Sequence, residues 1–297
     1  MTSAPGTPAH VLDGSPALPP LLLRGALLSP FKRPGPDAGF PRTRLVLPGL
    51  RVDPARLAAY QRVCGFPVGA DTLPVTYPHV LGFPAAMRLM SGRDFPLPLL
   101  GLVHTSVHLT RHRPSSAADA HELTVYVGGL RPHRRGTEAT VVTELRTGGD
   151  LVWESSSTYL ARHRTPARTP DAPGARPAHT PAAGPADDPA HLPAVDTWQL
   201  PGDLGRRYGA ASGDRNPIHL HPLTARPFGF PRAIAHGMWT AARCLAARPV
   251  PDAAVVRARF RAPVPLPATV TLAADGGHFA LRGPGDRVHL TGEVRPL

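Results

Sequence analysis

Three polar residues that could act together, Asp214, Asn216 and His219, stand close to one another in one loop-like stretch of the chain. Further along, residues 236–247 begin with His-Gly-Met and continue as an apolar, alanine-rich run, which indicates the start of a buried helix. A carboxylate and a neutral imidazole can hold one water and move its protons. Unpaired N–H groups at a helix start suit an oxygen that gains negative charge. These groups together predict a site that adds or eliminates water next to a carbonyl group.

The small residues around these groups fit that chemistry. Gly213 allows the backbone to turn sharply before Asp214, and Pro217 stiffens the loop while keeping Asn216 away from helical angles. Gly237 has no side chain that would block a carbonyl group from approaching its N–H. We therefore expect an acid, a base and a bare backbone amide to converge on one small volume.

The chain resembles the MaoC-like family, the (R)-specific enoyl-CoA hydratases and related thioester dehydratases, over residues 208–247. The resemblance rests on Tyr208, Ser212-Gly213-Asp214, Asn216-Pro217-Ile218-His219 and Ile234-Ala235-His236-Gly237-Met238. It implies an α+β double hot-dog fold, in which each unit is a long helix wrapped by a curved antiparallel sheet.

The resemblance also assigns roles to individual residues. Asp214 and His219 would be the catalytic pair, Asn216 would orient the loop or the water, and the Gly237 N–H would polarise the thioester carbonyl. Around that carbonyl, the resemblance places four further oxyanion or substrate-binding residues: Ser212, Gly213, His236 and Met238.

Each of these residues also has a plainer interpretation. Asp214 could simply cap a turn, and Ser212 is better explained as a turn former than as a nucleophile, because no Gly-x-Ser-x-Gly elbow surrounds it. His236 would help to seat the helix start, and Met238 would line the core. His219 and His221, with Asp214 or His236, could instead bind zinc. We predict no metal and no cofactor, because hydration needs neither.

The 297 residues divide by composition into a Pro/Gly-rich start at 1–40, two units at 41–161 and 195–297, and a Pro/Ala-rich linker at 162–194. Both units show the same order of strand, helices and then four strands. We expect strands at 43–49, 102–112, 122–130, 138–146, 151–161, 197–200, 255–261, 268–273, 278–281 and 288–294, and helices at 51–66, 80–91, 203–211 and 237–247.

The two units differ in their chemistry. The first unit has no Asp-x-Asn-x-x-His, and its counterpart of residues 234–238 is the segment 78–83, which keeps a His and a Gly but not side by side. Two interpretations stay open: the first unit shapes a pocket for the acyl chain, or it only stabilises the second unit.

The formal net charge is +12, almost all of it from arginine. Such a charge attracts phosphates, of coenzyme A or of a nucleic acid, but the joint abundance of Ala, Arg, Gly and Pro is also typical of a GC-rich genome. No Lys/Arg-rich run of the kind found in nucleic-acid patches occurs, so we expect no nucleic-acid partner. Arg257, Arg259 and Arg261 alternate along one strand and are expected on a solvated face, with coenzyme A phosphates as the alternative ligand.

The remaining sequence features indicate a cytoplasmic protein. The apolar stretch 21–28 is flanked by prolines and is too short to span a membrane, and no signal-peptide layout precedes it. We expect a loosely structured start, part of which packs on the folded body. Cys64 and Cys244 are the two cysteines, and their spacing favours free buried thiols.

The sequence therefore predicts a hydro-lyase that hydrates a trans-2-enoyl thioester to an (R)-3-hydroxyacyl thioester, or runs the reverse dehydration. Its partner would be an acyl-CoA or acyl-carrier thioester in fatty-acid or related acyl metabolism, and a homodimer stays open. The alternative is a non-catalytic hot-dog protein that binds acyl thioesters.

Overall fold

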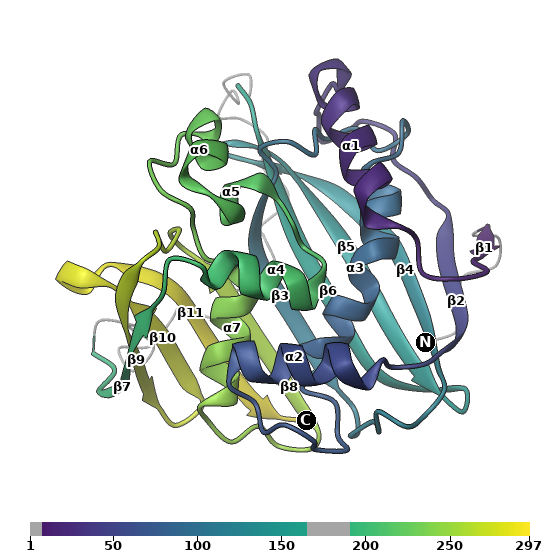
Figure 1. The fold of residues 1–297 in the computed structure, drawn as a ribbon. Coiled ribbons are helices and arrows are strands. Elements are labelled where there is room, and N and C mark those ends of the chain that lie inside the picture. Colours follow the sequence, from purple (N-terminus) through teal and green to yellow (C-terminus); the bar gives the residue numbers. More distant parts are fainter. Residues whose placement is uncertain (1–7, 165–190) are drawn as a thin grey trace, which may run out of the picture.

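The computed structural model describes residues 8–164 and 191–297, and a single sheet of eleven strands forms the back of the fold (Figure 1). The strands are β1 (Ala9–Val11), β2 (Arg44–Leu50), β3 (Val103–Arg111), β4 (His121–His133), β5 (Gly136–Thr147), β6 (Asp150–Arg162), β7 (Ala194–Leu200), β8 (Ala254–Phe260), β9 (Ala268–Asp275), β10 (His278–Arg282) and β11 (Val288–Pro296). Their order is β1-β2-β4-β5-β6-β3-β8-β11-β10-β9-β7.

The strand order is symmetric about the pair β3–β8. On one side β3 is followed by β6, β5, β4 and β2, and on the other β8 is followed by β11, β10, β9 and β7. At the junction Val107 pairs with Ala258 and Leu109 with Val256 in an antiparallel register. The predicted duplication is therefore confirmed, and pairing β3 with β8 removes two sheet edges that would otherwise lack hydrogen-bond partners.

Helices cover the inner face of the sheet. They are α1 (Leu18–Leu28), α2 (Pro54–Cys64), α3 (Tyr77–Met90), α4 (Leu204–Ser212), α5 (Pro217–Leu220), α6 (Pro222–Ala225) and α7 (Gly237–Ala246), with short 3₁₀ turns η1 (Ser29–Phe31), η3 (Arg226–Phe228) and η4 (Pro284–Asp286). Helix α3 packs on β4 and β5, and α7 on β10 and β11, so each half has a helix against its own strands (Figure 1). Helices α2 and α4 pack against each other between the halves.

The predicted elements are confirmed, with small shifts at their ends. Helix α2 begins at Pro54, three residues after the expected start, because Asp53 caps it: Oδ1 accepts hydrogen bonds from the N–H groups of Ala55 (2.8 Å) and Arg56 (3.3 Å). Helix α3 begins at Tyr77, three residues before the expected start, so that His79 lies in its first turn. Both cysteines are buried free thiols, as predicted.

The start of the chain is more ordered than expected. From residue 8 on, β1 pairs in parallel with β2, and α1 packs against α3. Pro19 and Pro20 lie in the first turn of α1, where their missing N–H groups cost nothing, and the leucines that follow give the helix its apolar side. This segment is more ordered than the expected loose start, and its packing on α3 confirms that part of the start lies on the folded body. Most of the predicted linker lies outside the described residues.

No helix among the described residues has both the length and the apolar character needed to cross a bilayer. Arg257 and Arg259 are exposed on β8, and Arg257 forms an ion pair of 2.8 Å with Glu293 on β11. These arginines therefore lie on a solvated face of the sheet, as expected.

Two glycines of α4 bring the predicted catalytic loop directly onto that helix. A Cβ added at Gly205 would overlap the backbone carbonyl oxygen of His219, and one added at Gly209 would lie 2.8 Å from the carbonyl oxygen of Asp214. Contacts this close leave no room for any side chain, so the positions of His219 and Asp214 are set by backbone packing on α4.

We expect Gly205→Ala to destabilise the protein. Alanine gains roughly 1 kcal/mol over glycine in helix propensity, but the overlap with the His219 carbonyl must push the loop off the helix. A net fall of about 1–3 kcal/mol in the free energy of unfolding should result, measured by urea denaturation. The control is Gly202→Ala, whose added Cβ would make an ordinary contact of 3.8 Å with Pro267. Equal stability of the two variants would contradict the close packing.

Candidate active site

The loop that carries the predicted catalytic residues starts at the end of α4. Gly213 ends the helix in the left-handed conformation (φ 84°), which glycine adopts without strain. The Ser212 hydroxyl donates to the Tyr208 carbonyl (2.9 Å) and accepts from the Asp214 N–H (3.2 Å). Ser212 is thus a turn former, as its plainer interpretation predicts, and with Gly213 it aims Asp214 back toward the interior.

Asn216 fixes the conformation of the loop between Asp214 and α5. Its side-chain oxygen accepts a hydrogen bond from the Ile218 N–H (3.4 Å) and so caps α5, and its own N–H donates to Asp214 Oδ1 (3.2 Å). The amide side chain therefore holds the loop, while the carboxylate of Asp214 receives one backbone hydrogen bond. Short helix α5 then brings His219 under this carboxylate.

The imidazole of His219 is buried, with 8% of the residue surface exposed. Its Nδ1 lies 2.7 Å from the carbonyl oxygen of Ile234, and because a carbonyl can only accept, Nδ1 carries the proton. In the neutral ring, Nε2 therefore keeps its lone pair. The arrangement fixes both the orientation of the ring and the nitrogen that is free to act as a base.

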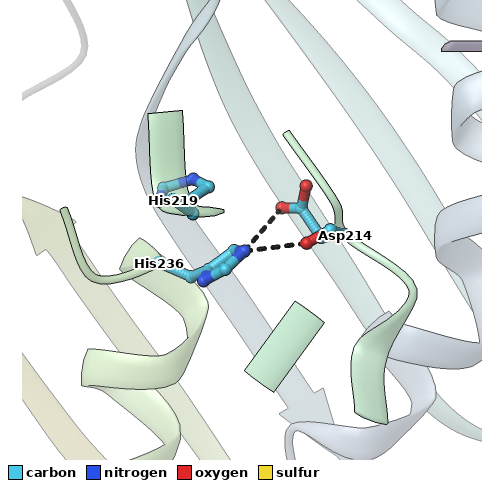
Figure 2. Close-up of side chains that lie close together, drawn as sticks. All are labelled: Asp214, His219 and His236. Atoms are coloured by element: carbon cyan, nitrogen blue, oxygen red, sulfur yellow. Dashed lines mark hydrogen bonds and ion pairs between the residues drawn. The ribbon is translucent and has the colours of Figure 1, made fainter. Parts of the chain in front are cut away.

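His236 is the residue that precedes α7, and it fastens the Asp214 segment (Figure 2). Its Nε2 donates to the backbone carbonyl of Asp214 (2.9 Å) and lies 3.9 Å from Asp214 Oδ2. The ring stacks on His219 with a centroid separation of 3.6 Å and contacts Tyr208 at 4.7 Å. As predicted, His236 seats the helix start, and it does so by holding the backbone of the acidic residue.

Asp214, His219 and His236 form one cluster in which one carboxylate oxygen and one ring nitrogen of each histidine lie within 4.8 Å of one another. A single water that makes two hydrogen bonds of about 2.8 Å separates its two partners by roughly 4.6 Å. One water can therefore bridge Asp214 and His219. Both histidines are buried, whereas 29% of the Asp214 side chain is exposed, so the cluster reaches solvent on the carboxylate side.

Burial keeps both imidazoles of the cluster neutral. It lowers the pKa of His219 below the ordinary 6.5, while the nearby Asp214 carboxylate acts in the opposite direction. Burial, reinforced by the neighbouring His219, holds the pKa of His236 well below 6.5. At neutral pH His219 therefore presents a lone pair, which is the form of a general base.

The same three residues could in principle bind a metal ion, but their hydrogen bonds favour proton transfer. His236 Nε2, the ring nitrogen that faces Asp214, already carries a proton that it donates to a carbonyl, as does Nδ1 of His219. A protonated nitrogen has no lone pair for a cation. His221 is exposed and its Nδ1 caps α6 by accepting from the Leu223 N–H (3.2 Å). The alternative of a zinc site built on the His-x-His pair gains no support.

Gly237 is the first residue of α7, and Phe260 of β8 packs over it, 3.1 Å from where a Cβ would lie. Its N–H belongs to the first turn, where amides have no partner within the helix. Met238 is buried in the core, as its plainer interpretation predicts. Phe260 was missed in the sequence, because its contact with Gly237 depends on how β8 passes the helix start.

Two surface hollows, of about 250 and 460 Å³, lie elsewhere on the protein. The first lies beside the β4–β5 end of the sheet and is lined by residues such as His121 and Arg146, and the second is lined by residues of α1 together with Arg93. Neither hollow is lined by Asp214, His219 or His236. The candidate site is therefore identified from the chemistry of these three residues and not from a cavity.

The chain is similar to proteins of known family. The chain is 40% identical to the 3-hydroxyacyl-thioester dehydratase X of Mycobacterium tuberculosis over 265 residues. The matched region covers 86% of this chain and 90% of that protein. The family model described as MaoC like domain matches residues 193–277. The chain belongs to the MaoC-like dehydratase family. The family match includes the whole motif from Tyr208 to Met238.

Solved structures place this MaoC-like protein among double hot-dog folds. The crystal structure of HtdX from Mycobacterium tuberculosis superposes with a TM-score of 0.72 at 37% identity, covering 86% of this chain and all of that one (100%). A second protein of that organism, described as having a double hotdog fold, gives a TM-score of 0.51 at 16% identity, covering 87% of this chain and 95% of that one. The expected fold class, α+β double hot-dog, is confirmed.

The buried histidines should make this MaoC-like protein sensitive to mild acid. Burial lowers the pKa of His79 to about 4 and of His104 to about 3, as well as those of His219 and His236. The unfolded chain, with ordinary values near 6.5, then binds more protons than the folded one as the pH falls below 6.5. Stability is fully present above that pH and declines below it, by up to about 1.4 kcal/mol per pH unit for each group.

Urea unfolding at pH 7.5, 6.5 and 5.5 measures this slope in a window where the imidazoles titrate and most carboxylates do not. His104→Phe removes one of the four groups and should make the slope shallower. A stability that stays constant down to pH 5.5 would contradict the buried, neutral state of these rings.

Proposed function

We propose that the protein catalyses the stereospecific hydration of a trans-2-enoyl thioester to an (R)-3-hydroxyacyl thioester, or the reverse dehydration. Identity of 40% to a 3-hydroxyacyl-thioester dehydratase supports a hydro-lyase that acts on acyl thioesters. The observation that carries the finer proposal is the separation of Asp214 and His219, which fits one shared water.

The bridging water supplies the hydroxyl group that is added at C3 and the proton that is added at C2. It donates one hydrogen bond to the Asp214 carboxylate and one to Nε2 of His219. As its oxygen bonds to C3, one of these two groups takes a proton, and a proton from the pair then passes to C2. The enzyme groups begin and end with the same protons, and dehydration follows the same path backward.

The thioester carbonyl gains negative charge while C3 is attacked, because electrons of the double bond move toward its oxygen. We assign the Gly237 N–H to this oxygen, since the first-turn amide of α7 is unpaired and carries partial positive charge. Asn216 and Ser212 act on the loop rather than on the substrate, through the hydrogen bonds that hold Asp214 in place.

A non-catalytic thioester-binding protein is the second candidate. It would not need a buried imidazole whose tautomer is fixed and whose free nitrogen lies within reach of a carboxylate. Saturable binding of an acyl-CoA without turnover would support this candidate.

We expect Asp214→Asn and His219→Gln each to lower kcat for hydration of crotonyl-CoA by about 10²–10⁴, because each removes one proton-transfer group. The reaction is followed by the loss of ultraviolet absorbance of the conjugated thioester. His221→Asn is the matched control: it changes an exposed neighbour outside the cluster and retains a side chain able to cap α6. Rates that remain at the wild-type level in the first two variants would remove the assignment, and an (S) or racemic product would contradict the stereochemistry.

The pH profile of hydration should report the protonation of His219. Its neutral form is the active one, and burial lowers its pKa, so kcat/KM should stay constant near neutral pH and fall only well below pH 6.5. In His219→Gln this acid limb should disappear from the residual activity. A limb centred at or above pH 6.5 in the wild type would show that a different group controls the reaction.

A further inference from the structure

Among the described residues, five polar atoms of the first half are buried without a hydrogen-bond partner, and one of them, Gln61 Nε2, lies apart on α2. The other four lie on α3, β3 and β6: His79 Nδ1, His104 Nε2, Ser155 Oγ and Ser157 Oγ. A buried polar group without a partner costs about 1–3 kcal/mol, and protein interiors contain few of them. Several in one region indicate a place where a partner binds.

The four atoms belong to one region of the inner face of the sheet. Residues 155, 157 and 159 point to the same side of β6, because side chains alternate along a strand. His104 on β3 pairs with Tyr159 on β6, and the two rings stack at 4.5 Å. The ring of His79 stacks on that of His104 at 5.8 Å.

Helix α3 covers this region from the other side (Figure 1). A Cβ added at Gly82 would lie 2.7 Å from Cγ2 of Thr143, and Thr143 pairs with Ser155 across β5 and β6. His79 stands one turn before Gly82 on the same helix. His79 therefore reaches His104 of β3 from α3, and Ser155 of β6 is the cross-strand neighbour of Thr143, the β5 residue on which α3 packs.

The two histidine rings lie in the interior of the fold. Burial is the largest influence on the pKa of each, which it lowers to about 4 in His79 and about 3 in His104. His104 also makes a hydrogen bond to the backbone of Ser106 that favours its protonated form, so this ring donates to a carbonyl. The unpaired Nε2 is then an acceptor that needs a donor.

These residues adjoin the proposed catalytic cluster of the second half. Phe260 contacts the ring of His104 at 4.9 Å and also packs against Gly237, the proposed oxyanion residue. The charge of Asp214 acts on both His79 and Tyr159. An acyl chain whose carbonyl binds at Gly237 can therefore extend along Phe260 into the first half.

We propose that His104 and Ser157, with His79 beside them, bind a hydroxyl group on the acyl chain, beyond the double bond, so that the preferred substrates are hydroxylated acyl thioesters. A hydroxyl suits this region because it donates to Nε2 of His104 and accepts from a serine hydroxyl. A plain hydrocarbon chain would displace water from these atoms and leave them without partners, which strongly disfavours its binding. The inference rests on the proposed hydration activity and names the substrate class for it.

The test compares trans-2-enoyl-CoA substrates of one chain length, without a hydroxyl and with one at successive carbons beyond C3. For the full-length wild type we expect kcat/KM to be about 10-fold to 100-fold higher for one hydroxyl position than for the plain chain. His104→Phe keeps a ring that packs on Tyr159 and Phe260 but lacks the acceptor, and Ser157→Ala removes one hydroxyl. In both variants this ratio should fall toward one.

Ser156→Ala is the matched control, because Ser156 lies on the opposite face of β6 and should leave the ratio unchanged. If His104→Phe does not fold, the pair Ser157→Ala and Ser156→Ala decides the question. A wild-type ratio near one at every position, or a ratio that the variants leave unchanged, would overturn the hydroxyl site and leave the hydration activity standing. Wild-type protein that hydrates none of the substrates would overturn the proposed function instead, and this inference with it.

Discussion

The hydrogen bond from His219 Nδ1 to the carbonyl of Ile234 is the interaction on which the site depends. It selects the tautomer, fixes the ring plane and leaves Nε2 as the free nitrogen. The carbonyl is itself held firmly, because the neighbouring backbone groups of Ile234 and Ala235 bond to Ile218 and Val264. A base whose orientation is set by backbone groups loses little entropy on reaction, and burial keeps it neutral at the pH where it must accept a proton.

Close packing of the loop backbone on α4 holds this interaction in place. Gly205 and Gly209 allow the loop that carries Asp214 and His219 to lie directly on α4, and His236 attaches the Asp214 carbonyl to the start of α7. The acid, the base and the helix start are thus joined through main-chain atoms of three segments. Such a frame holds the side chains of Asp214 and His219 at a spacing that fits one water.

The two halves share a strand order and have diverged in their chemistry. In the second half the segment 213–236 between α4 and α7 holds the catalytic loop, whereas in the first half the segment 65–76 between α2 and α3 is shorter and has no such motif. The first half instead places buried, unpaired polar atoms beside Phe260 and within the field of Asp214. The residues that surround the Asp214 cluster therefore differ in chemistry between the two halves.

The sequence by itself determined most of the elements, the duplicated order and the proposed catalytic motif, because periodicity and the spacing from Asp214 to Gly237 are local properties of the chain. It underestimated the order of the first forty residues, since α1 is stabilised by packing on α3. Only the tertiary structure decided that His104, Tyr159 and Phe260 meet beside the catalytic cluster. These contacts depend on the register of β3 with β6 and on the pairing of β3 with β8, and pairing between distant strands leaves no signal in the spacing of residues.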